Sequence, residues 1–172
     1  DIRYASTNNF MRSKFYKNER AFFNMSAADR LIEAKNDLKE LGYGIIIYDA
    51  YRPWFVTKMF WEGTPENLKH FVANPENGSS HNKGCAIDIG LYDIETGESI
   101  VMISGYDEFT ERAYPNYMGG SKKQRDIRDM LIQVMERNDF TVYEYEWWHF
   151  NYNGCDSGIM NYSFEELDSI SS

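Results

Sequence analysis

Apolar residues recur every three or four positions in two long segments of the chain, at about 27–41 and about 122–138. This spacing places them on one face of a helix, which can pack against a core. The apolar positions are Leu31, Ala34, Leu38 and Leu41 in the first segment and Ile127, Met130, Leu131 and Val134 in the second. The pattern therefore predicts two long amphipathic helices, of which the second is mainly scaffold.

Both predicted helices carry start signals, and the first also carries a stop signal. Ser26 can cap the first helix with Asp29 in the capping-box position, and Gly42 ends it. Ser121 and Gln124 have the spacing of a capping box at the start of the second helix. These signals set the expected helix boundaries.

Four shorter apolar runs predict strands. The run at 44–48 contains three consecutive isoleucines, which favour a strand that is covered on both sides. The other runs lie at 86–91, 140–142 and 147–152. A turn of the Asp-x-x-x-Gly kind is expected at 93–98, after the second strand.

Shorter helical pieces and a loop fill the middle of the chain. Pro53 fits the first turn of a short helix that runs to Trp61, a further helical piece is expected at 66–72, and 74–84 is expected to be loop. No repeat, low-complexity tract or linker divides the sequence, so residues 1–172 are expected to form one domain. The order of elements predicts an α+β fold, with a mostly antiparallel central sheet flanked by helices.

Composition and charge narrow the classes of function. The 172 residues are 42% hydrophobic and 16% aromatic, enough for a sizeable core. A net charge of -9 opposes attraction to nucleic acid and to anionic membranes, so neither is an expected partner. No run approaches the roughly 18 apolar residues of a spanning helix, so no membrane insertion is expected. The chain starts at Asp1 without a methionine, so we expect that an upstream segment has been removed.

Two of the three histidines stand among acids and turn residues. His81 precedes Asp88 by seven positions, and His149 follows Glu146 by three. Catalytic zinc sites use three imidazole or carboxylate ligands and keep a fourth position open for water. His81, Asp88 and His149 supply that set. His70 lies in a helix-like segment without a matching carboxylate, so we expect it to be solvated or satisfied by other contacts.

The two cysteines, Cys85 and Cys155, could form one bridge or remain two buried thiols. Free thiols are the favoured interpretation. Cys85 lies between His81 and Asp88 and could also be taken for a zinc ligand, but Asp88 is preferred.

The proposed ligands can meet only where the backbone departs from regular structure. Positions 81 and 88 would face opposite sides of a continuous strand, so a turn at 82–84 is required, and Gly84 permits it. Residues 146 and 149 face apart on an ideal strand, so a bend or bulge near 145–147 is also required. Of the tryptophans that follow Glu146, at least one is expected to pack in the core.

Four segments, 1–5, 48–53, 79–88 and 146–150, resemble the zinc D-Ala-D-Ala dipeptidases, the family that includes the vancomycin-resistance dipeptidase. The resemblance spans nearly the whole chain. Its Ser-x-His-x6-Asp and Glu-x-x-His elements are shared with other zinc D,D-peptidases. It implies the Hedgehog/DD-peptidase type of α+β fold and hydrolysis of D-Ala-D-Ala or a similar small D,D-dipeptide.

The same resemblance implies one zinc ion per chain, held by His81, Asp88 and His149. It implies that Glu146 acts as general base and acid on a zinc-bound water, and that Arg52 stabilises the oxyanion. The alternative for Arg52 is a structural salt bridge with one of the many carboxylates. Substrate contacts are implied for Tyr4, Ser79 and Asp107.

Three other functions remain open from the residues alone, and one of them, an acidic and catalytically silent surface protein, would bind no stoichiometric zinc. A D,D-carboxypeptidase or endolysin that acts on cell-wall peptides would need an open groove instead of a pocket closed near Asp107. A zinc-stabilised binding module would need no general base, which Glu146 argues against. The oligomeric state stays open, as does the compartment, for which a bacterial periplasmic or secreted location is slightly favoured.

Overall fold

The computed structural model describes residues 1–170 and contains a four-stranded sheet in the order β1-β2-β4-β3. The strands are β1 (Tyr43–Asp49), β2 (Ala86–Asp93), β3 (Phe140–Tyr143) and β4 (Glu146–Tyr152). All neighbouring pairs are antiparallel. The predicted α+β class with a central antiparallel sheet is confirmed.

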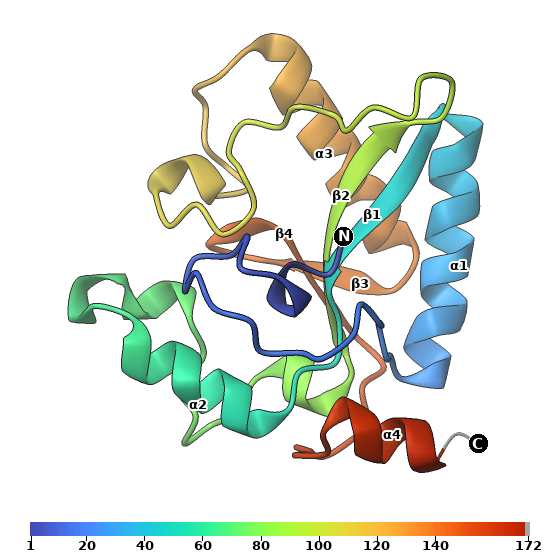
Figure 1. Cartoon of the computed structure of the whole chain (residues 1–172). Coiled ribbons are helices and arrows are strands. Elements are labelled where there is room, and N and C mark those ends of the chain that lie inside the picture. The colour runs from blue at the N-terminus through green and yellow to red at the C-terminus, as the bar shows by residue number, and fades with distance from the viewer. Residues whose placement is uncertain (171–172) are drawn as a thin grey trace.

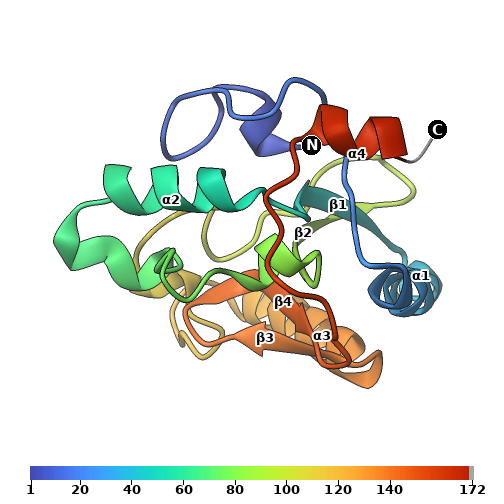
Figure 2. The ribbon, with the colours of Figure 1, turned by 90° about the horizontal axis from the view of Figure 1, so that it is seen from below.

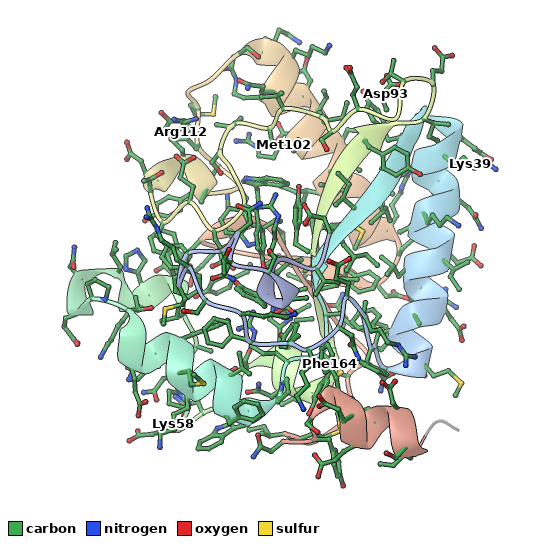
Figure 3. The ribbon with its side chains drawn as sticks, viewed as in Figure 1. Lys39, Lys58, Asp93, Met102, Arg112 and Phe164 are labelled. Atoms are coloured by element: carbon green, nitrogen blue, oxygen red, sulfur yellow. A yellow bond between two sulfur atoms is a disulfide. The ribbon has the colours of Figure 1, made fainter. Side chains whose placement is uncertain are left out.

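Helices cover both sides of the sheet (Figures 1 and 2). The long helices α1 (Met25–Glu40) and α3 (Lys122–Arg137) pack on one side, against each other and against β1 and β3. The N-terminal segment with α2 (Trp54–Gly63) and α4 (Phe164–Ile170) lies on the other side. Each side has its own apolar cluster, and Phe164 points from α4 into the second cluster while Lys39 and Lys58 project outward (Figure 3).

Strand β2 is the buried strand of the sheet, and β1 is an edge. Residues 86–91 are all buried, because β2 pairs with β1 and β4 and has both faces covered. Ile45, Ile46 and Ile47 on β1 are only half-buried, so the prediction that this strand is covered on both sides is wrong. An isoleucine run therefore indicated a strand correctly but not its place in the sheet.

The first long helix begins earlier than predicted. Its cap is Asn24, whose side chain accepts hydrogen bonds from the backbone N–H groups of Ser26 and Ala27 at 3.0 and 3.3 Å. Ser26 therefore lies inside the first turn, and the capping box with Asp29 is wrong. Gly42 ends the helix as predicted, with a φ of 90°. Leu41 is the C-terminal cap and is 52% exposed, so it is not part of the buried stripe.

The remaining helices and turns agree more closely with the predictions made from the sequence. The predicted capping box of Ser121 and Gln124 starts α3. The helical piece expected at 66–72 is a 3-10 helix, Glu66–Phe71. The expected loop at 74–84 contains one further 3-10 helix, η3 (Ser80–Lys83), which carries His81. Within residues 1–170, no helix is long and apolar enough to cross a membrane.

The two cysteines form a disulfide, so the favoured free-thiol interpretation is wrong. Their Cα atoms lie 5.9 Å apart although the residues are 70 positions apart. The pairing of β2 with β4 brings them together, since Ala86 lies opposite Asn151 and the Tyr152 N–H donates to the Cys85 carbonyl. The bridge ties the segment after β4 to the start of β2.

Candidate metal centre and active site

Three side chains from separate elements converge at one end of the sheet. His81 comes from η3, while Asp88 on β2 and His149 on β4 are direct cross-strand partners. Asp88 Oδ1 lies 3.2 Å from His81 Nε2 and 3.1 Å from His149 Nδ1, and the two nitrogens are 3.1 Å apart. Their near-equal separations form a triangle of one oxygen and two nitrogens, the only such group of three or more within residues 1–170.

A local network fixes the position of His81. The Ser79 hydroxyl oxygen accepts the backbone N–H of His81 at 3.2 Å. The buried Asn82 amide donates to the Arg52 carbonyl at 2.8 Å and to the Thr57 hydroxyl at 2.9 Å. Gly84 ends the turn in the left-handed region, with a φ of 66°. The turn required at 82–84 is therefore confirmed.

Hydrogen bonds orient both imidazole rings. His81 Nδ1 lies 2.6 Å from the Ala50 carbonyl oxygen, which can only accept, so Nδ1 carries the proton. His149 Nε2 lies 2.9 Å from Asn151 Oδ1, which likewise accepts. The unprotonated nitrogens, His81 Nε2 and His149 Nδ1, then face the common centre. Such outer hydrogen bonds are typical of histidines that bind metals.

Asp88 is buried with one unsatisfied oxygen. Its Oδ2 accepts the Tyr106 hydroxyl at 2.7 Å, whereas Oδ1 has no hydrogen-bond donor among the described residues. A buried carboxylate oxygen without a donor is costly, and a cation would compensate it.

The triangle fits a tetrahedral zinc ion. Ligand atoms about 2.0–2.2 Å from zinc lie about 3.3 Å or slightly more from one another. The observed 3.1 to 3.2 Å separations approach this value. Two neutral imidazoles and one carboxylate also match the donor types that zinc accepts in catalytic sites.

Glu146 lies beside this group because β4 bulges. Tyr143 pairs with Glu146 and Val142 pairs with Phe150, so residues 147–149 have no partner on β3. Glu146 Oε2 therefore comes within 3.7 Å of His149 Nδ1. Burial, reinforced by the charges of two nearby aspartates, raises the pKa of the Glu146 carboxyl well above its usual value. The predicted bulge is confirmed.

Arg52 is held by a buried carboxylate that the sequence analysis did not single out. Its Nε and Nη2 donate to Asp49 Oδ2 at 3.0 and 2.8 Å. Asp49 also accepts the Tyr16 hydroxyl at 2.8 Å. The salt bridge considered as an alternative for Arg52 is thus present, and the guanidinium also faces the ring of Phe60, 4.7 Å from its centroid. The sequence did contain a signal for this ion pair, because Asp49 lies at the end of β1, three positions before Arg52.

The polar side chains border a cavity of about 200 Å³. Tyr4 and Asp107 both line it, and the Tyr4 hydroxyl donates a 2.5 Å hydrogen bond to Asp107 Oδ2. Burial raises the pKa of Asp107 to about 7 even though the Tyr4 hydrogen bond opposes the shift. Ser79 also lines the cavity. Its apolar wall is formed by Phe10, Phe60, Phe71 and Phe109.

The sequence profile of peptidase family M15, described as D-Ala-D-Ala dipeptidase, matches residues 1–168. The chain belongs to this family. It is therefore a metallopeptidase of the D-Ala-D-Ala dipeptidase family, as the resemblance implied.

Relatives of known name support the same assignment. A D-alanyl-D-alanine dipeptidase of Enterococcus faecium is 32% identical over 171 residues, covering 87% of this chain and 83% of its own length. One from Escherichia coli K12 is 30% identical over 150 residues, covering 87% and 76%. The solved structure of the LdcB LD-carboxypeptidase, 19% identical, superposes with a TM-score of 0.50 over 82% of this chain and 65% of that chain. At that identity the likeness concerns the fold alone.

In this member of the dipeptidase family, the structure brings together all eight residues singled out from the sequence around one cavity. They are His81, Asp88, His149, Glu146, Arg52, Tyr4, Ser79 and Asp107.

His70 is exposed, and its ring packs on Phe71 and Tyr145 instead. Trp147 and Trp148 are both buried, and the Trp147 indole donates to the Ser104 hydroxyl at 2.8 Å.

Proposed function

We propose that this chain is a zinc dipeptidase that hydrolyses D-Ala-D-Ala or a similar small D,D-dipeptide, with residues 1–172 as one catalytic domain. His81, Asp88 and His149 would hold one zinc ion. The observation that carries the proposal is the triangle of three ligand atoms 3.1 to 3.2 Å apart beside a buried carboxylate. A zinc ion bound there would supply Lewis-acid polarisation and a more acidic water.

Glu146 is the proposed general base and acid. It would accept a proton from the attacking water and return it to the leaving amine, so that the C–N bond breaks and two free amino acids form. Burial raises the pKa of the Glu146 carboxyl well above its usual value, which makes its carboxylate a stronger base for the water proton. A binding module without turnover would have no use for a base here.

Arg52 is the proposed partner of the oxyanion. Asp49 holds two of its nitrogens, and its third, Nη1, makes no hydrogen bond within residues 1–170. Arg52 lines the same cavity as the three proposed metal ligands, so it would offer a preoriented cation to the negative charge that develops there. The salt bridge and the catalytic role are therefore compatible, because Asp49 fixes the guanidinium for its task.

Asp107 is the proposed partner of the substrate ammonium group. Tyr4 has a single hydroxyl proton and gives it to Asp107, so it would orient this carboxylate. Ser79 or a nearby backbone N–H would face the terminal carboxylate. A cavity of about 200 Å³ is small for a ligand site and suits a dipeptide better than a cell-wall polymer.

Zinc content and D-alanine release, measured on the same purified protein, test this proposal. We expect one zinc per chain and release of D-alanine from free D-Ala-D-Ala, with little from L-Ala-L-Ala or a longer muropeptide. Faster cleavage of the muropeptide would favour a D,D-carboxypeptidase or endolysin. Tight zinc without turnover of any substrate would favour a binding module.

His149→Ala should lose the metal, and a variant that still holds one tight zinc would refute the ligand set.

A further inference from the structure

Besides Tyr4, a second tyrosine, Tyr106, reaches the proposed metal site with its hydroxyl group. Its ring packs against aromatic rings on two sides. It stacks on Tyr48, with the ring centroids 4.5 Å apart and an interplanar angle of 27°. On another side it meets Trp148 edge to face, with the centroids 5.5 Å apart. In such aromatic surroundings a phenylalanine would pack equally well, and a hydroxyl group is costly unless it is hydrogen-bonded. The hydroxyl therefore needs an explanation of its own.

Counting protons shows where this hydroxyl is used. The Tyr106 oxygen lies 2.7 Å from Asp88 Oδ2 and 3.3 Å from the Tyr4 oxygen. Tyr4 gives its one proton to Asp107 at 2.5 Å, and Tyr106 has one proton to give. The shorter contact, to a carboxylate, is the stronger one. Tyr106 thus donates to Asp88, and its contact with Tyr4 is secondary.

We infer that Tyr106 is a positioning residue that makes Asp88 a single-oxygen ligand. The inference rests on the proposed metal site. The phenol occupies Oδ2 and leaves Oδ1 as the oxygen that faces His81 Nε2 and His149 Nδ1. Without the hydroxyl, the carboxylate could rotate and present both oxygens, which would crowd the position that a catalytic zinc keeps open for water.

This role predicts a specific pattern in the variant Tyr106→Phe, which keeps the ring and removes only the oxygen. Loss of a hydrogen bond to a metal ligand typically weakens metal affinity by about 10- to 100-fold. We expect zinc affinity to fall by about tenfold or more. We also expect kcat at saturating zinc to fall, with KM nearly unchanged because Tyr4 and Asp107 keep their own hydrogen bond.

Tyr48→Phe is the matched control. It removes a hydroxyl from the ring that stacks on Tyr106, and within residues 1–170 that hydroxyl has no hydrogen bond to Asp88, His81 or His149. Zinc affinity of both variants and of the unaltered protein is measured by competition with a chelator. The visible spectrum of the cobalt-substituted proteins reports the ligand geometry, and thermal melting of the metal-free proteins reports folding.

The expected result is weaker zinc binding and an altered cobalt spectrum in Tyr106→Phe alone, with metal-free proteins that melt alike. Unchanged zinc affinity and spectrum in Tyr106→Phe would overturn the inference. So would an equal loss in both variants, which would indicate ring packing instead of the hydrogen bond. If the unaltered protein holds no tight zinc, the proposed metal site itself fails, and the inference fails with it.

Discussion

Tyr4 and Asp107 are 103 positions apart in the chain, yet the Tyr4 hydroxyl donates a 2.5 Å hydrogen bond to Asp107 Oδ2. Asp107 also has a φ of 57°, a left-handed conformation that non-glycine residues adopt rarely. The N-terminal segment thus lines part of the cavity and holds the carboxylate that we assign to the substrate ammonium group.

Asp107 should make substrate binding depend on pH near neutrality. Its pKa, raised to about 7 by burial, means that the carboxyl becomes neutral as the pH falls through 7. The ammonium group then loses its anionic partner, so KM for D-Ala-D-Ala should rise as the pH falls. Steady-state kinetics between pH 5.5 and pH 8.5, at roughly half-unit steps across the expected midpoint, measure this rise.

Asp107→Asn is the control for this pH effect. It should raise KM by about tenfold or more, the cost of losing a charged hydrogen bond, and should remove the pH dependence of KM in that interval. Its zinc content should equal that of the unaltered protein. A variant whose KM still rises on acidification would assign the titration to another group.

Glu146→Gln should separate metal binding from chemistry. The amide keeps the size of the side chain but cannot accept and return a proton, so kcat should fall by about 100-fold or more. The zinc content should stay at one per chain, because the three proposed ligands are intact. Single-turnover rates and metal analysis on the same sample check both expectations, and appreciable residual turnover would remove Glu146 from its role.

The centre could be anticipated from the sequence because its chemistry depends on few residue types. With three histidines in the chain, the choice of imidazole ligands was narrow, and the strand period required a turn at 82–84 and a bulge in β4. Ser121 and Gln124 were equally readable, since a capping box is a local signal. The same kind of signal was wrong for α1, where Asn24 is the cap in place of Ser26.

Features that depend on distant contacts were missed. Asn24 and Ser26 are both good caps, and Asn24 caps the helix while its backbone N–H donates to the Gly84 carbonyl at 2.8 Å. Tyr106 meets Asp88 only in the folded chain. Asn151, whose side chain accepts from His149 Nε2, could have been found from the sequence. It follows His149 by two positions, and residues two apart on a strand share a face.

The disulfide was unpredictable for the same reason, and its contribution to stability can be measured. Replacing Cys85 and Cys155 together by serine should lower the free energy of unfolding by about 4 kcal/mol, because the bridge closes a loop of 70 residues in the unfolded chain. Urea denaturation of the zinc-bound proteins gives the difference. Reducing agent should destabilise the unaltered protein and leave the double variant unaffected. Two titratable thiols in the untreated protein would contradict the bridge.

Arg52→Met should lower kcat more than it raises KM. An oxyanion partner acts mainly in the transition state, and removal of one such donor typically lowers kcat by about 100- to 1000-fold. The same substitution leaves the buried Asp49 without its cation, which should destabilise the fold by about 3–5 kcal/mol. Loss of activity alone therefore does not distinguish catalysis from a structural salt bridge.

The double variant Arg52→Met with Asp49→Asn resolves this ambiguity. It removes both charges, and the asparagine can still accept the Tyr16 hydroxyl, so most of the lost stability should return. If Arg52 acts on the oxyanion, kcat stays low although the fold is restored, because the guanidinium that stabilises the oxyanion is still missing. If Arg52 serves only to neutralise Asp49, kcat recovers together with the free energy of unfolding. Chemical denaturation and kcat measured on both variants separate these outcomes.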